Sequence, residues 1–366
     1  MLKPRLFFRK NYIFAVAAIV LAALNSNCPR ASKPKATILN STALGIDIGG
    51  TNTKLSLVSP EGSIIARSAF PTQQANTQDE YGALLVDAAR RLLRKSAAPL
   101  AGVGIGAPGC DPALGVINYA ANLPFIAAFP IRDFLAEALC AHTVLVKDST
   151  AAALGEKMWG GAQNMDNFIL LTLGTGLGSA FYFNGKVVEG AHGLASELGH
   201  ITIPGNSRQC ACGRKGCLET LVSASGLRRT CQLLMAQELT PSALRALPED
   251  KLTAKSIALI ALEGDPLAQM AIDHMCNALG SALAPLVLQM DPEGIFLSGG
   301  MLNAGALLTD TIAHHMNKAL LENFRGQARV AISSLGPDEA GMLGAAAQVY
   351  RTAEQPAAER AKIKKV

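Results

Sequence analysis

A histidine and three cysteines have the spacing of a metal site within residues 197–219. A disulfide would leave one of the three cysteines unpaired, and a thioredoxin-like redox pair needs C-x-x-C, one residue longer than the Cys-Ala-Cys found here. Four nitrogen and sulfur ligands match the number that a structural Zn²⁺ ion requires. The pattern H-x9-C-x-C-x4-C therefore predicts a tetrahedral zinc site, with ligands His200, Cys210, Cys212 and Cys217.

Three glycine-containing stretches follow apolar segments and could hold phosphate. Without a Cβ, glycine lets backbone N–H groups approach a phosphate closely, and a nearby Thr or Lys adds side-chain donors. A tight hairpin explains any single turn more simply, but their recurrence in two similar halves favours phosphate binding. The stretches are Gly49, Gly50, Thr51, Asn52, Thr53 and Lys54; Gly174, Thr175 and Gly176; and Ser298, Gly299 and Gly300.

Two aspartates end predicted strands at positions suited to phosphoryl transfer. Asp47 precedes the first glycine turn, where its carboxylate could hold a hydrated Mg²⁺ ion beside phosphates. Turn capping is its alternative role. Asp148 lies between a strand and a helix, so it could be an N-cap, which is compatible with catalysis. Since phosphoryl transfer needs an acceptor for the proton of the attacking hydroxyl, we take Asp148 as the candidate catalytic base.

Two common nucleotide motifs are excluded. Gly104, Gly106 and Gly109 satisfy G-x-G-x-x-G after a strand, but Pro108 interrupts the motif and the residues that follow have no helical period. The helix N-terminus that would hold a pyrophosphate is therefore not expected. The P-loop pattern G-x-x-x-x-G-K-[ST] does not occur in the sequence.

Apolar segments and turns predict an α/β protein built from two similar halves. Residues 44–58 and 167–183 each read as a strand, a glycine turn and a second strand, which suggests duplicated domains facing a cleft. Further strands are expected at 63–68, 101–107, 143–147, 294–300 and 328–334, and helices near 80–95, 131–139, from Ser149, through much of 220–290 and at 338–350.

The two ends of the chain differ in charge from its body. The whole sequence has a formal net charge of +5, yet residues 38–359 hold 22 basic and 28 acidic side chains, so no stripe for nucleic acid is expected. Residues 1–40 are a basic and apolar extension. Its apolar run at 12–24 resembles a signal-peptide core and is too short to span a membrane; a misassigned start is the other explanation. Residues 351–366 are a basic tail.

Nine motifs in order resemble the ROK family of sugar kinases and sugar-responsive repressors, and in particular its bacterial glucokinases. They extend from about residue 44 to 350 and read GIDIGGTNTKLSLV, GIGAPG, AANLPF, KDSTAAALGE, LTLGTGLGSA, GLASELGH, CACGRKGCLE, LSGGM and LGPDEAGMLGAA. The resemblance implies the actin-like, ribonuclease-H-like fold, with lobes at 43–150 and 151–350 around a cleft. The zinc-binding insertion at 197–219 belongs to the second lobe.

The resemblance also implies ATP, Mg²⁺ and structural Zn²⁺ as cofactors. The first two glycine stretches, with Asp47, match the family's phosphate segments, and the third matches its adenosine segment. Asp148 matches the catalytic base, and the four predicted zinc ligands match the family's zinc motif. His200, bound to zinc through one ring nitrogen, would keep the other for a sugar hydroxyl. The residues that match the sugar pocket are Asn122, Glu197, His200 and Glu219.

One position departs from the family pattern. Lys147 precedes the candidate base where family kinases usually have an asparagine that touches the sugar. A lysine ammonium donates hydrogen bonds but cannot accept them. Lys147 is therefore expected to bind the substrate and to alter which hydroxyl pattern is selected.

The expected activity is ATP-dependent phosphorylation of a hexose, with glucose as the first candidate. Mannose, allose or an N-acetylhexosamine, and polyphosphate as donor, stay open. A catalytically silent sugar-binding regulator is the alternative that Lys147 raises. A DNA-binding repressor is not expected, because the residues before Leu44 lack a recognition-helix pattern. Zinc-binding thiolates and the need for ATP predict a cytoplasmic protein, and the family implies a homodimer or homotetramer.

Overall fold

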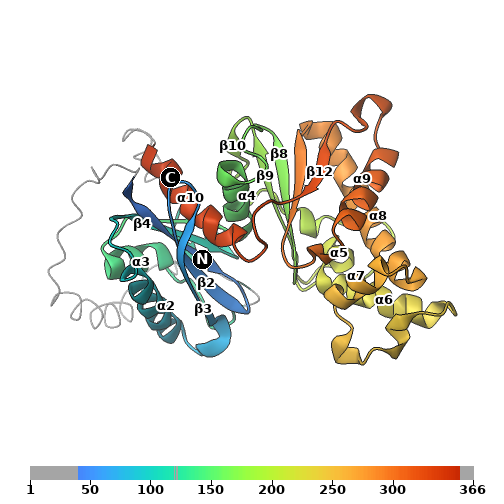
Figure 1. Ribbon diagram of the computed structural model, residues 1–366, viewed down its shortest axis with the longest axis horizontal. Helices are drawn as coiled ribbons and strands as arrows, with labels where there is room; N and C mark the ends of the chain where they lie inside the picture. Colours follow the sequence, from blue (N-terminus) through green and yellow to red (C-terminus); the bar gives the residue numbers. More distant parts are fainter. Residues whose placement is uncertain (1–39, 119, 121–122, 355–366) are drawn as a thin grey trace, which may run out of the picture. The chain divides into compact units, whose positions relative to one another are not determined.

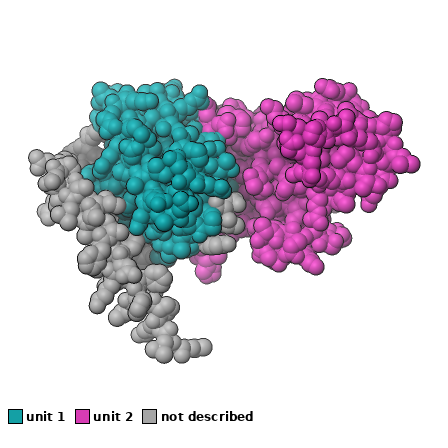
Figure 2. Space-filling model, turned by 90° about the horizontal axis from the view of Figure 1, so that it is seen from below, with its two compact units in different colours: residues 1–151, 341–366 teal, residues 152–340 magenta. Residues whose placement is uncertain are grey.

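The computed structural model describes residues 40–118, 120 and 123–354, which form two compact units (Figures 1 and 2). Among the described residues, unit 1 contains those from Asn40 to Ala151 and those from Gly341 to Glu354, and unit 2 extends from Ala152 to Ala340. The sequence assigned the whole of 151–350 to one lobe. The structure differs there, because the last helix returns to unit 1.

A five-stranded mixed sheet in the order β3-β2-β1-β4-β7 forms the centre of unit 1. Strands β1 to β3 are antiparallel, and β4 and β7 run parallel to β1. Alternate residues of β1, namely Leu44, Ile46 and Ile48, face one apolar core with Tyr81 and Leu85 of α2. The elements are β1 Thr42–Ile48, β2 Asn52–Val58, β3 Ile64–Pro71, α2 Gln78–Leu93, β4 Leu100–Ala107, β5 Cys110–Asp111, β6 Val116–Ile117, α3 Ile131–Leu139 and β7 Thr143–Lys147.

Helix α10 (Ala340–Glu354) packs on the opposite face of this sheet. A Cβ on Gly104 of β4 would lie 1.8 Å from the carbonyl oxygen of Ala345. Only glycine permits so close an approach of helix and sheet backbones. The G-x-G-x-x-G motif is therefore a packing feature here, and Gly109 leads into β5 rather than into a helix.

Unit 2 repeats the plan of unit 1, as the two similar strand-turn-strand segments predicted. Its sheet has the order β10-β9-β8-β11-β12, with β8 to β10 antiparallel and β11 and β12 parallel to β8. Ile169, Leu171 and Leu173 of β8 share an apolar core with the helices of this unit. The strands are β8 Phe168–Leu173, β9 Leu177–Phe183, β10 Lys186–Val187, β11 Gly294–Ser298 and β12 Arg329–Ile332.

Most helices of unit 2 belong to the stretch that separates β10 from β11. Helix α8 (Pro266–Met290) is long and apolar enough to cross a membrane by length and composition, but 56% of its apolar window is buried within the protein. It is therefore a core helix, in contact with α6, α7 and α9. The other helices are α5 Glu219–Val222, α6 Ala224–Gln237, α7 Ala254–Leu262 and α9 Ala306–Lys318.

Short 3-10 helices complete the fold: η2 Thr72–Gln74, η3 Leu198–His200, η4 Ala243–Ala246, η5 Glu249–Lys251, η6 Leu302–Ala304 and η7 Glu322–Phe324. Helix α4 (Asp148–Trp159) begins in unit 1 and continues into unit 2. Its buried Glu156 accepts hydrogen bonds from the hydroxyl of Ser333 and, at 2.7 Å, from the amide of Gly161. These bonds fix the end of α4 against the segment that follows β12.

Candidate active site and metal centre

The candidate site residues of unit 1 lie at, or directly after, the ends of strands that finish at the same sheet edge. Asp47 of β1 pairs with Gly106 of β4, and Ala107 of β4 pairs with Lys147 of β7. Because these three strands are parallel, Asp47, Lys147 and Asp148 all lie at their carboxyl ends. Sheets of this kind bind ligands at that edge.

The carboxylate of Asp47 packs against the first turn of α10. A Cβ on Gly341 would lie 2.5 Å from Cγ of Asp47 and 2.7 Å from its Oδ2, so only glycine leaves room for this carboxylate. The N-terminal end of a helix carries a partial positive charge that favours an anion. The packing holds Asp47 at the sheet edge, next to the first glycine turn.

The first glycine turn has a buried support. The Gly49 amide donates to the carbonyl oxygen of Asn52 at 3.0 Å, which closes the turn. The Thr53 hydroxyl, which the sequence placed in the phosphate segment, is 0% exposed and hydrogen-bonds at 2.9 Å to the hydroxyls of both Thr72 and Tyr81. Burial raises the pKa of Tyr81 well above its usual value, so its hydroxyl keeps its proton. The buried hydroxyl of Thr53 thus stabilises the turn through these two hydrogen bonds.

Asp148 is the first residue of α4, and its side chain is exposed. Its Oδ1 accepts a hydrogen bond from the Ser149 amide at 2.7 Å, so it occupies the helix start that the sequence predicted. Burial, together with the negative charge of Asp148, raises the pKa of Cys110 to about 12. Cys110 is therefore a neutral neighbour of the candidate base.

The other two glycine stretches lie side by side in unit 2. The Gly174 amide donates to the carbonyl oxygen of Gly176 at 3.0 Å. Ser298, at the end of β11, pairs with Thr172 of the neighbouring β8. A Cβ on Gly299 would lie 2.3 Å from the carbonyl oxygen of Leu173, which precedes the Gly174 turn. Both stretches thus lie at one edge of the second sheet.

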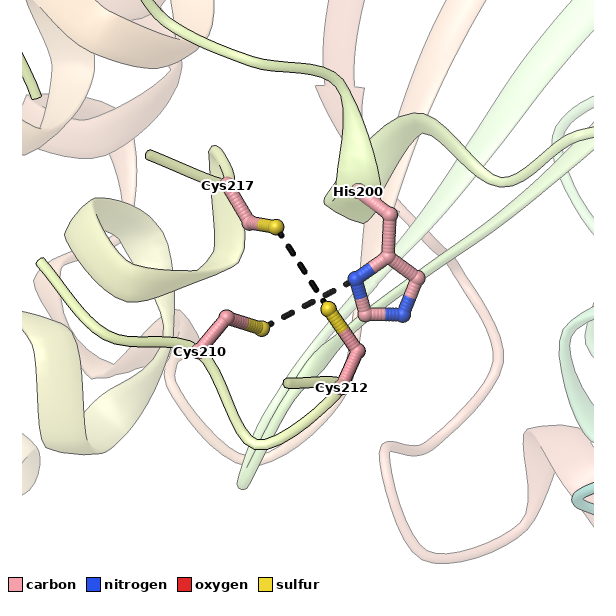
Figure 3. A group of neighbouring side chains, drawn as sticks. All are labelled: His200, Cys210, Cys212 and Cys217. Carbon is pink, nitrogen blue, oxygen red and sulfur yellow. Dashed lines mark hydrogen bonds between the residues drawn. The ribbon is translucent and has the colours of Figure 1, made fainter. Parts of the chain in front are cut away.

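The predicted zinc ligands form one cluster, and their ligand atoms all lie within 4.8 Å of one another (Figure 3). The Sγ atoms of Cys212 and Cys217 are 3.6 Å apart, and Sγ of Cys210 is 3.9 Å from Nδ1 of His200. A disulfide needs a sulfur–sulfur distance of about 2.05 Å. Ligands around tetrahedral Zn²⁺ lie roughly 3.3 to 3.8 Å apart, given bond lengths of about 2.0 to 2.3 Å. The cluster therefore fits zinc and does not form a disulfide.

The surroundings of the cluster shift the pKa values of its three cysteine thiols. Burial raises the pKa of Cys210 to about 12 and also raises the pKa of Cys217, whereas a hydrogen bond from the backbone of Arg214 lowers that of Cys212. Thiolates are the zinc-binding form, so a zinc ion must displace protons from the metal-free site. Metal affinity is expected to fall as the pH is lowered.

Glu219 connects the zinc cluster to the second glycine turn. Its Oε2 accepts a hydrogen bond from the Leu177 amide at 3.0 Å, and its Oε1 lies 3.6 Å from Sγ of Cys210. A Cβ on Gly176 would lie 2.5 Å from the same Oε2, so this glycine leaves room for the carboxylate. Glu197 is exposed just before η3, whose last residue is His200, and its carbonyl oxygen accepts the His200 amide at 3.1 Å.

The predicted sugar-binding residues come from both units. Lys147 and Asp148 belong to unit 1, and Glu197, His200 and Glu219 belong to unit 2. The prediction for Asn122 falls outside the described residues. The bracing of Thr53 by Tyr81 and the packing of Gly341 on Asp47 were missed, because both contacts join segments far apart in the sequence.

Comparison with known proteins identifies the class of protein. The two units share one plan, and the chain has the actin-like ATPase fold of ROK sugar kinases. The ROK family matches residues 43–352, so the chain belongs to the ROK family.

Individual relatives are similar over most of the chain. A glucokinase of Halalkalibacterium halodurans is 36% identical over 313 residues, which are 82% of this chain and 92% of that protein. A glucokinase of Thermotoga maritima is 32% identical over 306 residues, 83% of this chain and 95% of that protein. The crystal structure of a ROK family glucokinase from Streptomyces griseus, in complex with glucose and AMPPNP, matches with a TM-score of 0.74 and 28% identity, over 85% of this chain and 100% of that one.

Proposed function

We propose that this protein transfers the γ-phosphoryl group of ATP to the 6-hydroxyl of a hexose, with glucose as the substrate. The observation that carries the proposal is the exposed carboxylate of Asp148, at the ligand-binding edge of unit 1 in a chain that is 36% identical to a glucokinase. The resemblance of the motif around Asp148 to the family's catalytic segment supports its role.

In this reaction Asp148 accepts the proton of the sugar 6-hydroxyl while that oxygen bonds to the γ-phosphorus. The bond between the γ-phosphorus and the bridging oxygen breaks, and ADP leaves with the electron pair. Such a reaction depends mainly on positioning and on charge stabilisation. A bound Mg²⁺ ion would neutralise phosphate charge, and Asp47 would hold its hydration shell.

The glycine turns would hold the nucleotide phosphates. Gly49, Gly50, Thr51 and Asn52 are accessible at the first turn, and Gly174, Thr175 and Gly176 at the second. Backbone N–H groups at such turns suit phosphate oxygens. Thr53 supports the first turn through its buried hydroxyl, and Ser298, Gly299 and Gly300 would contribute the adenosine segment.

We assign sugar binding to the residues around the metal centre and the base. A zinc ion on His200, Cys210, Cys212 and Cys217 would fix the imidazole orientation, so that its free nitrogen meets a sugar hydroxyl. Glu197, Glu219 and Asn122 would accept from or donate to further hydroxyls, since carboxylates and amides suit vicinal diols. Lys147 would contribute hydrogen-bond donors only, because its ammonium group cannot accept a hydrogen bond.

A coupled assay with ATP and Mg²⁺ against a panel of hexoses tests the proposal. We expect glucose to give the highest kcat/KM among glucose, mannose, allose and N-acetylhexosamines. A protein that binds glucose yet phosphorylates no sugar on the panel would instead be a sugar-binding regulator, the alternative that Lys147 leaves open.

The need for ATP and for reduced zinc ligands supports a cytoplasmic location. Cys210, Cys212 and Cys217 are free thiols in the structure. We also propose a homodimer or homotetramer, by analogy with the family, which light scattering on the purified protein would test.

A further inference from the structure

The carboxylate of Glu219 is carried by a helix that is too short to hold its own position. Helix α5 has four residues, and isolated helices shorter than about 12 residues are marginal in water. The carbonyl oxygens of a last helical turn also lack partners within the helix. Bonds from other parts of the chain must therefore keep Glu219 beside the Leu177 amide and Sγ of Cys210.

Arg208, in the zinc-binding insertion, supplies such bonds. Its Nη1 donates to the carbonyl oxygens of Thr220 at 2.9 Å and of Gly226 at 3.1 Å, and its Nη2 donates to the hydroxyl of Thr230 at 2.9 Å. Thr220 directly follows Glu219, and Gly226 lies in the first turn of α6. One guanidinium therefore connects the insertion to both α5 and α6.

Asn206, two residues earlier, holds the beginning of the same short helix. Its Nδ2 donates to the carbonyl oxygen of Cys217 at 3.1 Å and to the hydroxyl of Thr220 at 2.9 Å. Its Oδ1 accepts from the Arg208 amide at 3.1 Å, and the Arg208 carbonyl oxygen accepts from the Gly216 amide at 3.0 Å. The backbone of Arg208 is thus fixed where its side chain can reach past α5 to α6.

The guanidinium of Arg208 has no acidic partner among its hydrogen bonds to the described residues, because all three go to neutral oxygens. Burial, together with the nearby Arg229, lowers the pKa of Arg208. A charge that is buried without an opposite charge costs free energy. What arginine adds in return is a rigid fork of donors that reaches several acceptors at once.

We infer that Arg208 is a positioning residue for sugar binding, which sets the place of Glu219 by holding the backbone at Thr220 and Gly226. The inference rests on the proposed function, because that function assigns Glu219 to a sugar hydroxyl. Arg208 acts through Glu219 on binding alone. Its loss therefore raises the KM for glucose and leaves kcat at saturating glucose nearly unchanged.

Equilibrium binding of glucose to the full chain, with zinc content and kcat measured on the same samples, tests this inference. Arg208→Met keeps the length of the side chain and removes every donor. We expect the Kd for glucose to rise about tenfold, the scale of a lost hydrogen bond from a charged group. The zinc content should stay at the wild-type value, and kcat within about twofold.

Arg208→Lys is the conservative variant. Its ammonium keeps the charge and can donate to one of the carbonyl oxygens, but it lacks the fork that spans Thr220 and Gly226. The Kd for glucose should therefore rise by only about threefold, roughly half of the free-energy change caused by Arg208→Met. This variant decides the test if Arg208→Met fails to fold.

A double-mutant cycle separates the positioning of Glu219 from a general loss of stability. In a protein that already contains Glu219→Ala, the further change Arg208→Met should raise the Kd for glucose by less than about twofold, because the side chain that Arg208 positions is gone. Two unrelated structural defects would instead multiply their effects on the Kd.

Arg245→Met is the matched control. Arg245 belongs to η4 of the same unit, and its guanidinium also donates to three carbonyl oxygens, of which none belongs to the zinc-binding insertion or to α5. The acceptors are Met235, Glu238 and Thr240. Arg245→Met should therefore lower stability while the Kd for glucose stays within about twofold of the wild-type value.

The inference is wrong if Arg208→Met and Arg208→Lys bind glucose as tightly as the wild type, if the wild type does not bind glucose, or if the effects multiply in the cycle. It is also wrong if Arg208→Met loses zinc, since Arg208 would then act through the metal centre. Failure of the function itself looks different: glucose would bind in a manner that depends on Arg208, but no hexose would be phosphorylated.

Discussion

The carboxylate of Glu219 accepts a hydrogen bond from the amide of Leu177 at 3.0 Å, and Leu177 directly follows the Gly174–Gly176 turn. Because the other oxygen of Glu219 lies 3.6 Å from Sγ of Cys210, one side chain touches both the proposed phosphate turn and the metal centre. The sequence suggested only a sugar contact for Glu219. The structure adds a direct connection between the two parts of the site.

This connection predicts that two variants of Glu219 differ in their KM for ATP. Glu219→Ala leaves the Leu177 amide without its acceptor, so the KM values for ATP and for glucose should both rise, by about tenfold. Glu219→Gln keeps a carbonyl oxygen that can accept from Leu177. Its KM for ATP should stay near the wild-type value, while its KM for glucose rises. An alanine variant that changes the KM for glucose alone would contradict the structural role.

Removal of one zinc ligand should lower both metal content and sugar affinity. Elemental analysis of protein purified without added metal should find one Zn²⁺ per chain, and Cys212→Ser should lose most of it and bind glucose more weakly. Ala211→Ser, a neighbouring exposed change in the same loop, is the control and should retain the zinc. A protein with a stoichiometric disulfide and no metal would refute the assignment.

Lys147 should act on the choice of sugar more than on the chemical step. Lys147→Asn restores an acceptor at this position, so the ranking of hexoses by kcat/KM should change by about tenfold for at least one pair, or about 1.4 kcal/mol. The test compares the hexose panel for both proteins. An unchanged ranking would show that Lys147 does not contact the sugar.

The contribution of the buried Thr53 hydroxyl to the first turn can be measured as a change in the free energy of unfolding. Thr53→Val preserves the shape but removes the hydroxyl that bonds to Thr72 and Tyr81, so the free energy of unfolding should fall by about 1 to 3 kcal/mol. Thr51→Val, at an exposed position of the same turn, should change it by no more than about 0.5 kcal/mol. Equal effects in urea denaturation would show that the buried network does not support the turn.

Local patterns in the sequence predicted much of the fold, and they singled out a histidine and three cysteines whose side chains lie together in the structure. The two strand-turn-strand segments follow from alternating apolar residues around glycines, and both appear as β1–β2 and β8–β9. The zinc cluster follows from ligand type and spacing, because three of its four ligands lie on one short loop. Their ligand atoms converge as expected.

Features that depend on distant segments were not predicted. Helix α10 joins unit 1 because Gly104 admits its backbone, but no periodicity in either segment shows that the two pack together. The same holds for Gly341, which makes room for Asp47. These two contacts join residues that lie 241 and 294 positions apart in the chain.

The role of Asp148 as catalytic base is tested most directly by single-turnover phosphorylation of glucose by Asp148→Asn, with glucose binding measured on the same protein. Asparagine keeps the size of the side chain and the oxygen that accepts from Ser149, but it cannot take the hydroxyl proton. We predict glucose binding within about threefold of the wild type and a rate lower by about 10² to 10⁴, the usual contribution of one positioned base. A near-normal rate with intact binding would contradict the assignment of Asp148.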